Sequence, residues 1–273
     1  MNTREQQERA VFTALYRDEA REIAILSSEG CEGAGRAGKA LIWSANCDIL
    51  AYKDGGQLHH EEGSVSWPAN DAELNSDDRP RFRDLTLYRL RVCPHKTAPH
   101  DFLLLDILAA DVADSDLETI RAAYRQPVIW QEAPFASFTL DKNFHTYNGE
   151  GDWPGQTIRF ALDGDDEQAR PTAAAIATLR RLTAAPQAWH DRLTAHAAHA
   201  LLDTARAWQA DAENGDPGLS EAAFTRRIRL EEITIGEDGS FTAWFNDDSI
   251  FWGHVITVSI GADGAYEDAD IAG

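Results

Sequence analysis

Two adjacent carboxylates and an imidazole lie close together near the C-terminal end of the chain. Asp247 and Asp248 precede the tetrapeptide FWGH, which ends at His254. Carboxylate oxygens and an imidazole nitrogen can bind a divalent metal that activates water for hydrolysis. One hypothesis is therefore a metal-dependent hydrolase that uses these three residues. The sequence favours a structural role, because an isolated buried His is usually a hydrogen-bonded core residue, and it predicts no catalytic residue, metal or cofactor.

The segment that contains this histidine is predicted to be a central, largely buried strand from Phe251 to Ile260, because large apolar residues occur on both of its faces. Alternation along a strand would place one set of side chains on a common face, namely Trp252, His254, Ile256, Val258 and Ile260. Replacement of Trp252 by Ala would then leave a core cavity and cost about 3–5 kcal/mol.

A second motif, GAGRAGK at Gly33 to Lys39, matches the first seven positions of a phosphate-binding loop. Ala40 stands where that loop needs a Ser or Thr hydroxyl to hold magnesium. The residues that follow favour a strand rather than the helix whose N-terminus would hold the phosphate. The motif is therefore interpreted as a glycine-rich hairpin loop that does not bind nucleotide.

The remaining candidate metal ligands are dispersed. His190, His196 and His199 fall on one predicted helix, but they lack the spacing and the glutamate of a His-Glu-x-x-His zinc site. His59 and His60 lie in a polar segment. The cysteines are three in number and form no Cys-x-x-Cys pair, which predicts buried, reduced thiols.

Charge is distributed unevenly along the chain. The net charge is -21, and residues 231–273 contain ten acidic residues and no Lys or Arg. Such a charge disfavours nucleic acid as a partner. Solubility alone could explain it; the alternative is a surface that docks a basic protein partner, with four residues as its proposed contacts: Asp263, Glu267, Asp268 and Asp270.

Composition and the length of the apolar segments indicate the cellular compartment of the protein. Hydrophobic residues make up 43% of the chain, which is typical of a globular protein. Met1 to Ala10 lacks the apolar stretch of a secretory signal. The most apolar run, Phe102 to Val112, contains two Asp residues and is too short to cross a bilayer. The sequence therefore predicts a cytoplasmic protein without a membrane partner.

Helical and strand patterns predict an α+β fold with antiparallel sheets packed with helices, in two modest domains. Residues 1–132 would form an N-terminal α+β domain with a long polar excursion, Lys53 to Arg83, that holds at most a short strand around Val65 to Trp67. Residues 133–273 would form a C-terminal α+β domain with a meander, two helices and three C-terminal strands. In the first domain, Ser115 and Glu118 match a capping box at the start of a helix.

Three segments of the second domain, DDSIFWGHVITVS, DADIAG and DWPGQTIRFAL, resemble an uncharacterised bacterial family, domain of unknown function 2262. The resemblance covers Ala133 to Gly273, and SANCDILAYKDGG gives the N-terminal part a looser likeness. It implies an α+β domain in soluble bacterial proteins and brings no catalytic residues. By analogy with other acidic families of this size, the first hypothesis is an immunity-type inhibitor of a toxin. The alternatives are the hydrolase and a structural or regulatory protein.

Overall fold

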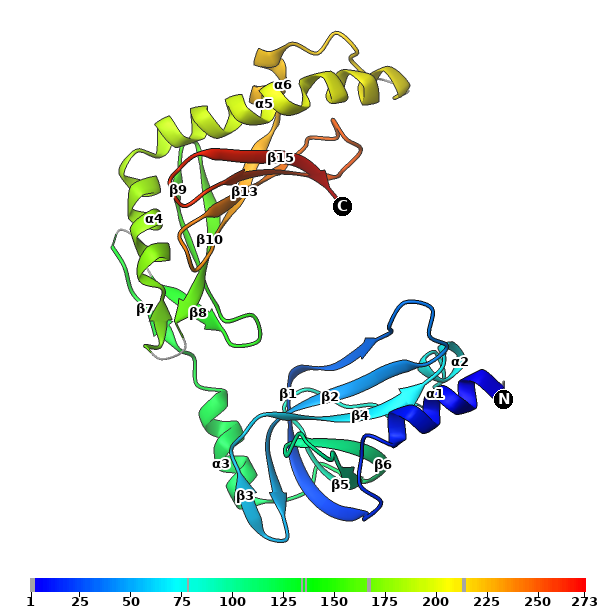
Figure 1. Ribbon diagram of the computed structural model, residues 1–273. Coiled ribbons are helices and arrows are strands. Elements are labelled where there is room, and N and C mark those ends of the chain that lie inside the picture. Colours follow the sequence, from blue (N-terminus) through cyan, green and yellow to red (C-terminus); the bar gives the residue numbers. More distant parts are fainter. Residues whose placement is uncertain (1–2, 78, 134, 136, 166–167, 213–214) are drawn as a thin grey trace. The chain divides into compact units, whose positions relative to one another are not determined.

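The computed structural model describes residues 3–77, 79–133, 135, 137–165, 168–212 and 215–273. The chain divides into two compact units, Met1–Gln126 and Pro127–Gly273 (Figure 1). We call the first the barrel domain and the second the sheet domain. Each combines helices with a mostly antiparallel sheet, which confirms the predicted α+β class. No described helix has both the length and the apolar character needed to cross a membrane.

The sheet of the barrel domain closes on itself. Its five main strands are β1 (Arg21–Gly35), β2 (Trp43–Asp54), β4 (Gly63–Ala69), β5 (Leu87–Pro94) and β6 (Asp101–Ala110). They pair in the circuit β1-β2-β4-β6-β5 and back to β1, and among these described pairs β4–β6 alone is parallel. This strand order with one parallel pair is that of the five-stranded Greek-key barrel called the OB fold.

The long strand β1 makes closure possible. Its pairing with β2 changes register on both sides of Ser27, where bulges bend the strand and increase its twist. The N-terminal part of β1 can therefore pair with β2 on one side and with β5 on the other. The enclosed core includes Ile25, Val65 and Phe102, which are fully buried. All three cysteines are buried and free, as the sequence predicts.

The stretch Lys53 to Arg83 contains more regular structure than predicted, although the expected short strand around Val65 to Trp67 is present. This stretch contains β3 (Gln57–His59), the seven-residue strand β4 and the short helix α2 (Asp71–Leu74). β4 lies between β2 and β6 and buries Val65 and Trp67 inside the barrel. Its few apolar residues are sufficient because Val65, Trp67 and Ala69 alternate along the strand and all pack into the barrel core.

Two further helices belong to this domain, α1 (Thr3–Thr13) and α3 (Ser115–Tyr124). The cap of α3 differs from the predicted one: Asp114, not Ser115, is the N-cap residue. Its carboxylate accepts hydrogen bonds from the N–H groups of Asp116 and Leu117 at 3.1 and 3.2 Å and lies 3.1 Å from Lys53 Nζ. Ser115 is instead the first helical residue.

Replacement of Asp114 by Ala is expected to destabilise the barrel domain by about 1–2 kcal/mol at neutral pH. Burial alone would raise the pKa of Asp114, but the hydrogen bonds from Leu117 and Lys53 outweigh burial and lower the pKa. The ionised cap therefore stabilises the fold above the unfolded-state pKa, and this contribution is lost as pH falls through the lower folded-state pKa. Urea unfolding at neutral pH and below about pH 3 would measure the difference between wild type and variant. An equal difference at both pH values would contradict the assignment.

The sheet domain contains a nine-stranded sheet in the order β15-β14-β13-β12-β10-β9-β8-β7, with β11 paired to β10. Its strands are β7 (Ile129–Trp130), β8 (Phe138–Asp141), β9 (Thr146–Trp153), β10 (Gln156–Asp165), β11 (Arg170–Pro171), β12 (Arg229–Ile235), β13 (Phe241–Asn246), β14 (Val255–Ile260) and β15 (Tyr266–Ala272). Every described pair is antiparallel except β10–β12. β15, which the sequence analysis does not include, is the edge strand next to β14.

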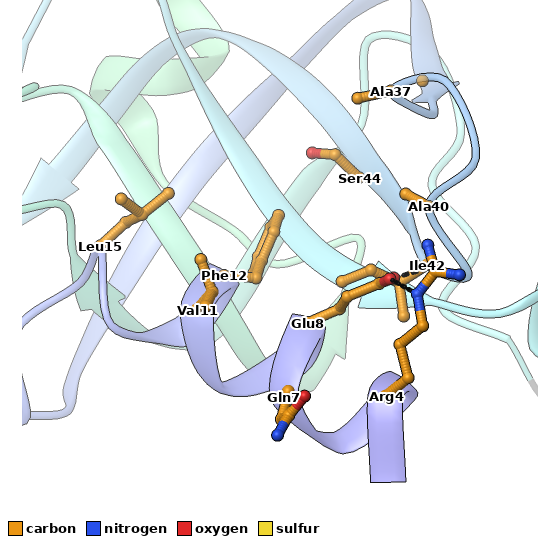
Figure 2. A pocket seen from close by; sticks show the side chains of 11 residues that line it. Arg4, Gln7, Glu8, Val11, Phe12, Leu15, Ala37, Ala40, Ile42 and Ser44 are labelled. Carbon is orange, nitrogen blue, oxygen red and sulfur yellow. Dashed lines mark hydrogen bonds and ion pairs between the residues drawn. The ribbon is translucent and has the colours of Figure 1, made fainter. Parts of the chain in front are cut away.

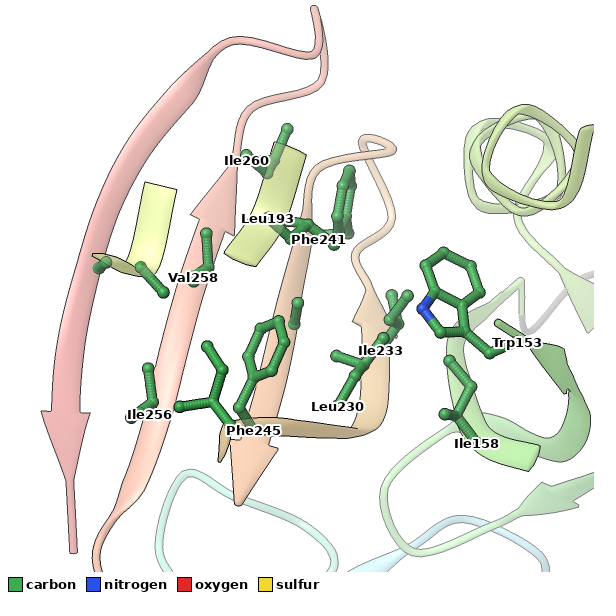
Figure 3. Close-up of a cluster of buried hydrophobic side chains, with 14 of the residues drawn as sticks. Trp153, Ile158, Leu193, Leu230, Ile233, Phe241, Phe245, Ile256, Val258 and Ile260 are labelled. Atoms are coloured by element: carbon green, nitrogen blue, oxygen red, sulfur yellow. The ribbon is translucent and has the colours of Figure 1, made fainter. Parts of the chain in front are cut away.

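Helices α4 (Ala173–Ala184) and α5 (Pro186–Asp211) pack against this sheet, and α6 (Glu221–Arg227) packs against α5 (Figure 1). Alternate residues of the strands point toward the helices and are buried. Figure 3 shows Leu193 of α5 beside Phe241, in a core that also contains Ile256 and Val258. One face of β13 and β14 is thus fixed by the helices that cover it.

Candidate functional site

The segment Asp247 to His254, which we call the FWGH loop, joins β13 to β14. The prediction that a strand begins at Phe251 is wrong, because β14 begins at Val255. Asp248, Ser249 and Trp252 have positive φ angles of 46°, 59° and 62°. Residues other than Gly rarely adopt this backbone region, and a strand does not contain it. Trp252 and His254 therefore do not continue the buried face of Ile256.

Asp247 holds this strained loop in shape. Its side chain is 2% exposed, and its two oxygens accept three backbone hydrogen bonds. Oδ1 accepts from Ser249 N at 3.1 Å, and Oδ2 accepts from Phe251 N at 2.7 Å and from Gly253 N at 3.1 Å. These bonds satisfy the buried carboxylate and tie together the positive-φ residues, so they stabilise one conformation of the loop.

The loop exposes one large aromatic side chain. Trp252 is 58% exposed, whereas its neighbour Phe251 is fully buried. The prediction that Trp252 is a core residue is therefore wrong, although Ile256 is buried as predicted. Trp208 of α5 lies beneath the loop, with ring centroids 4.8 Å from Trp252, 5.3 Å from His254 and 5.6 Å from Phe251. The result is an aromatic cluster whose outermost ring faces solvent.

The three residues of the hydrolase hypothesis have separate structural contacts. His254 Nδ1 lies 2.6 Å from the carbonyl oxygen of Phe251, so this nitrogen carries the proton that it donates. Asp248 forms an ion pair with Arg227 at 2.8 Å, and Asp247 is occupied by backbone N–H groups. Among the residues that the structure describes, no group of three His, Cys, Asp or Glu side chains could hold a metal. These contacts lend no support to a hydrolase.

The four proposed partner contacts lie on and beside the edge strand. Glu267, Asp268 and Asp270 are exposed on β15, and Asp263 is exposed in the turn that precedes it. We call these four residues the acidic edge. In the described contacts none of them forms an ion pair with a Lys, Arg or His side chain. The far end of β15 reaches the FWGH loop, because Ala272 pairs with Val255 and Gly273 lies against the ring of His254.

The acidity of residues 231–273 is partly compensated by arginines from earlier segments. Arg159 pairs with Glu232 at 3.0 Å, and Arg227 pairs with Asp248. The sequence analysis did not single out Arg227, and it did not place Trp208 beside the FWGH loop. Fewer carboxylates of this segment are therefore unpaired than its composition suggests, and the acidic edge is among those that are.

The other sequence candidates are dispersed in the structure. His190 accepts a hydrogen bond from Trp153 Nε1 at 3.3 Å, and His196 stacks on Tyr266 at 4.3 Å. Burial lowers the pKa of His196, and nearby Arg192 lowers it further. His59 stacks on Tyr52 in the barrel domain. These rings have packing partners, and the structure does not join them into a site.

The glycine-rich motif lies partly in a strand. Gly33 and Gly35 belong to β1 and pair with Asn46 and Ser44 of β2. Arg36 to Ile42 forms the connection between these strands, and Gly38 there adopts a positive φ of 50°. The motif thus leads into β2 instead of a helix, which removes the N-terminal N–H groups that a phosphate-binding loop uses.

The fold defines the class: a two-domain α+β protein with a closed barrel and a helix-covered sheet that presents a rigid aromatic loop beside an acidic edge. The chain belongs to the family described as an uncharacterised protein conserved in bacteria, domain of unknown function 2262, whose model matches residues 132–271. A second model, domain of unknown function 7021, matches residues 8–124. No curated protein and no solved structure matches the chain.

Proposed function

We propose that the protein is a binding protein whose sheet domain docks a basic protein partner. The observation that carries this proposal is the exposure of Trp252 on a loop that a buried carboxylate holds in shape. Tryptophan is enriched among the residues that contribute most to protein interfaces. A rigid loop loses little conformational entropy on binding, so an exposed ring in this setting is a favourable anchor.

The acidic edge gives the partner its chemical class. Asp270 lies on the same strand as Ala272, whose pairing with Val255 brings the end of β15 to the FWGH loop. An apolar anchor at one end of β15, with carboxylates spaced along that strand and Asp263 in the turn at its other end, suits a partner surface in which an apolar pocket lies beside a row of Lys or Arg residues. Complementary charge mainly accelerates association and selects the partner.

The finer form of the proposal is an immunity-type inhibitor that covers the basic cleft of a bacterial toxin. Two observations support it. One is the acidic edge, and the other is that Asp247, Asp248 and His254 each make separate structural contacts instead of pointing into a shared catalytic site. We infer that it acts in the cytoplasm, because the three cysteines are free thiols and disulfides form mainly in oxidising compartments. A partner that proves to be neutral or acidic would refute both forms.

The acidic edge provides the first test. Protein captured from the native host with the wild-type chain is identified, and its association is followed at rising salt. Joint replacement of Asp263, Glu267, Asp268 and Asp270 by Asn or Gln is expected to slow association about tenfold at low salt, with a smaller effect on dissociation. The difference should shrink at about 0.15 M salt, where screening reduces the Debye length to about 8 Å.

A matched control removes the same charge elsewhere. Glu19, Glu22, Glu29 and Glu62 are exposed on the barrel domain and form no ion pair in the described contacts. Their joint replacement by Gln should leave the association rate close to that of the wild type. Equal slowing in both quadruple variants would mean that net charge alone acts, and an unchanged rate in the first variant would exclude the acidic edge as a docking surface.

A further inference from the structure

The barrel domain contains an apolar groove that the proposed function does not use. It lies between α1 and the connection from β1 to β2, and its cavity volume is about 540 Å³ (Figure 2). Val11 and Phe12 line it from the helix, Leu15 lines it from the turn that follows, and Ala40 and Ile42 line it from the opposite wall. Volumes of about 300–1,000 Å³ with mostly apolar walls are typical of small-molecule sites. We call this feature the α1 groove.

Polar contacts hold α1 in place and keep the groove open. The Glu8 carboxylate accepts hydrogen bonds from the N–H groups of Leu41 and Ile42 at 2.7 and 3.2 Å. Arg9 donates to the carbonyl oxygen of Pro68 at 2.9 Å. No described residue of α1 is buried, and Val11 and Leu15 remain 69% and 48% exposed. The helix is therefore fixed on the barrel without covering its own apolar stripe.

The shape of the groove favours a linear apolar chain. Its lining runs along α1 from Arg4 to Phe12, which at the rise of an α-helix corresponds to about 12 Å, and continues past the end of the helix to Leu15. The facing wall includes Gly35, Ala37 and Ala40, whose small side chains make it smooth. A smooth wall offers no pockets for the bulky side chains of a folded partner, whereas an extended dodecyl chain matches it in length.

Positive charge lies at one end of the groove. Arg4, whose side chain is 56% exposed, pairs with Glu8 at 3.0 Å and donates to the carbonyl oxygen of Lys39 at 2.7 Å. Lys39 is exposed and has no ion pair among the described contacts. Glu8 is the one acidic residue in the lining, and hydrogen bonds from Leu41, Ile42 and Arg4 hold its pKa below the usual value. Glu8 therefore stays ionised and compensates the charge of Arg4. The positive charge that remains at this end is that of Lys39, which does not line the groove but adjoins it through the hydrogen bond from Arg4 to its carbonyl oxygen.

We propose that the α1 groove binds a single-chain anionic amphiphile, such as a long-chain acyl carboxylate, with the chain along Val11, Phe12 and Leu15 and the head group at Arg4 and Lys39. The acyl chain gains from burial against both walls, and the carboxylate gains from Lys39 and from Arg4, whose charge Glu8 compensates in part. The ligand is taken up as a free molecule rather than as part of a bilayer, because a net charge of -21 repels an anionic membrane surface.

Calorimetric titration with dodecanoate, below its micelle concentration, tests the proposal. Saturable binding at one site per chain is expected. Leu15→Ser should weaken binding about tenfold, and Lys39→Gln about threefold to fivefold. Dodecyltrimethylammonium has the same chain with the opposite charge and should bind more weakly than dodecanoate.

The matched control is Leu108→Ser, because Leu108 is 40% exposed on β6 of the same domain and does not line the groove. It should leave the affinity for dodecanoate unchanged, and the urea midpoints of all variants should match that of the wild type. Absence of saturable binding, equal weakening by Leu15→Ser and Leu108→Ser, or sedimentation with anionic vesicles without binding of free dodecanoate would each overturn the proposal. Partner capture through the sheet domain is unaffected by any of these results.

Discussion

Replacement of Asp247 by Ala is expected to lower the free energy of unfolding of the sheet domain by about 3–4 kcal/mol. The substitution leaves the N–H groups of Ser249, Phe251 and Gly253 without their acceptor. The Phe251 donor is buried, and an unsatisfied buried donor costs about 1–3 kcal/mol, whereas the two donors on exposed residues cost less. It also removes the contacts that compensate the positive φ angles of the FWGH loop. Urea unfolding followed by far-UV circular dichroism measures the change.

The variant Asp247→Asn tests whether stability depends on both carboxylate oxygens as acceptors or only on a polar side chain of this size. Its single carbonyl oxygen can replace only part of the acceptor set, so a loss of about half that of Asp247→Ala is expected. Asp248→Ala is the control on the adjacent residue, because Asp248 is exposed and contributes an ion pair with Arg227. A loss below about 1 kcal/mol for Asp247→Ala would contradict the role assigned to Asp247.

Replacement of Trp252 by Ala is expected to weaken binding of the basic partner at least about thirtyfold, because interface anchors of this type contribute about 2 kcal/mol or more. The same variant should lose only about 1 kcal/mol of stability, since the ring is largely exposed and its contact with Trp208 is partial. This expectation replaces the larger cavity cost that a buried Trp252 implies. Surface plasmon resonance and urea unfolding measure the two quantities.

Phe144 is the matched control for Trp252. It is an aromatic residue of the same domain and is 71% exposed, in the turn between β8 and β9. Phe144→Ala should leave the partner affinity within about twofold of the wild type, because a residue outside an interface contributes nothing to its stability. If Trp252→Ala retains full affinity, or if Phe144→Ala weakens binding equally, then the FWGH loop is not the anchor.

Strand patterns predict the sheet domain well where helices cover one face only. Residues of β12, β13 and β14 alternate between the core and the other face, so Ile233, Ala243 and Val258 are recognisable from periodicity. β15 escapes this reasoning because its exposed positions carry carboxylates, and an acidic edge strand resembles a loop in sequence. The barrel strand β4 is predicted only as a short strand around Val65 to Trp67, because its apolar core positions are few: Val65, Trp67 and Ala69.

The candidate site was predictable in position but not in the roles of its residues. The sequence singles out Asp247 to His254, yet it considers Asp247 only as a candidate ligand of the alternative hydrolase and places Trp252 in the core. The roles seen in the structure depend on the positive φ angles at Asp248, Ser249 and Trp252. The sequence does not reveal these angles, because the apolar run IFW is typical of a buried strand. Once the backbone turns there, Asp247 becomes the acceptor for the loop and the indole ring is directed outward.

The parallel pairing of β10 with β12 has a consequence for the route by which the chain folds. Residues 159–162 pair with 232–235, and three helices lie between them in the sequence. The strands on either side, β7 to β10 and β12 to β15, are joined to their neighbours by short connections and can form quickly as separate meanders. Joining the two meanders requires closure of a long loop, and the entropy cost of this closure comes before the contacts between β10 and β12 can stabilise the junction. We therefore expect this junction to form late, in the rate-limiting step, so that substitutions at Phe160 or Ile233 slow folding more than equally buried substitutions within either meander.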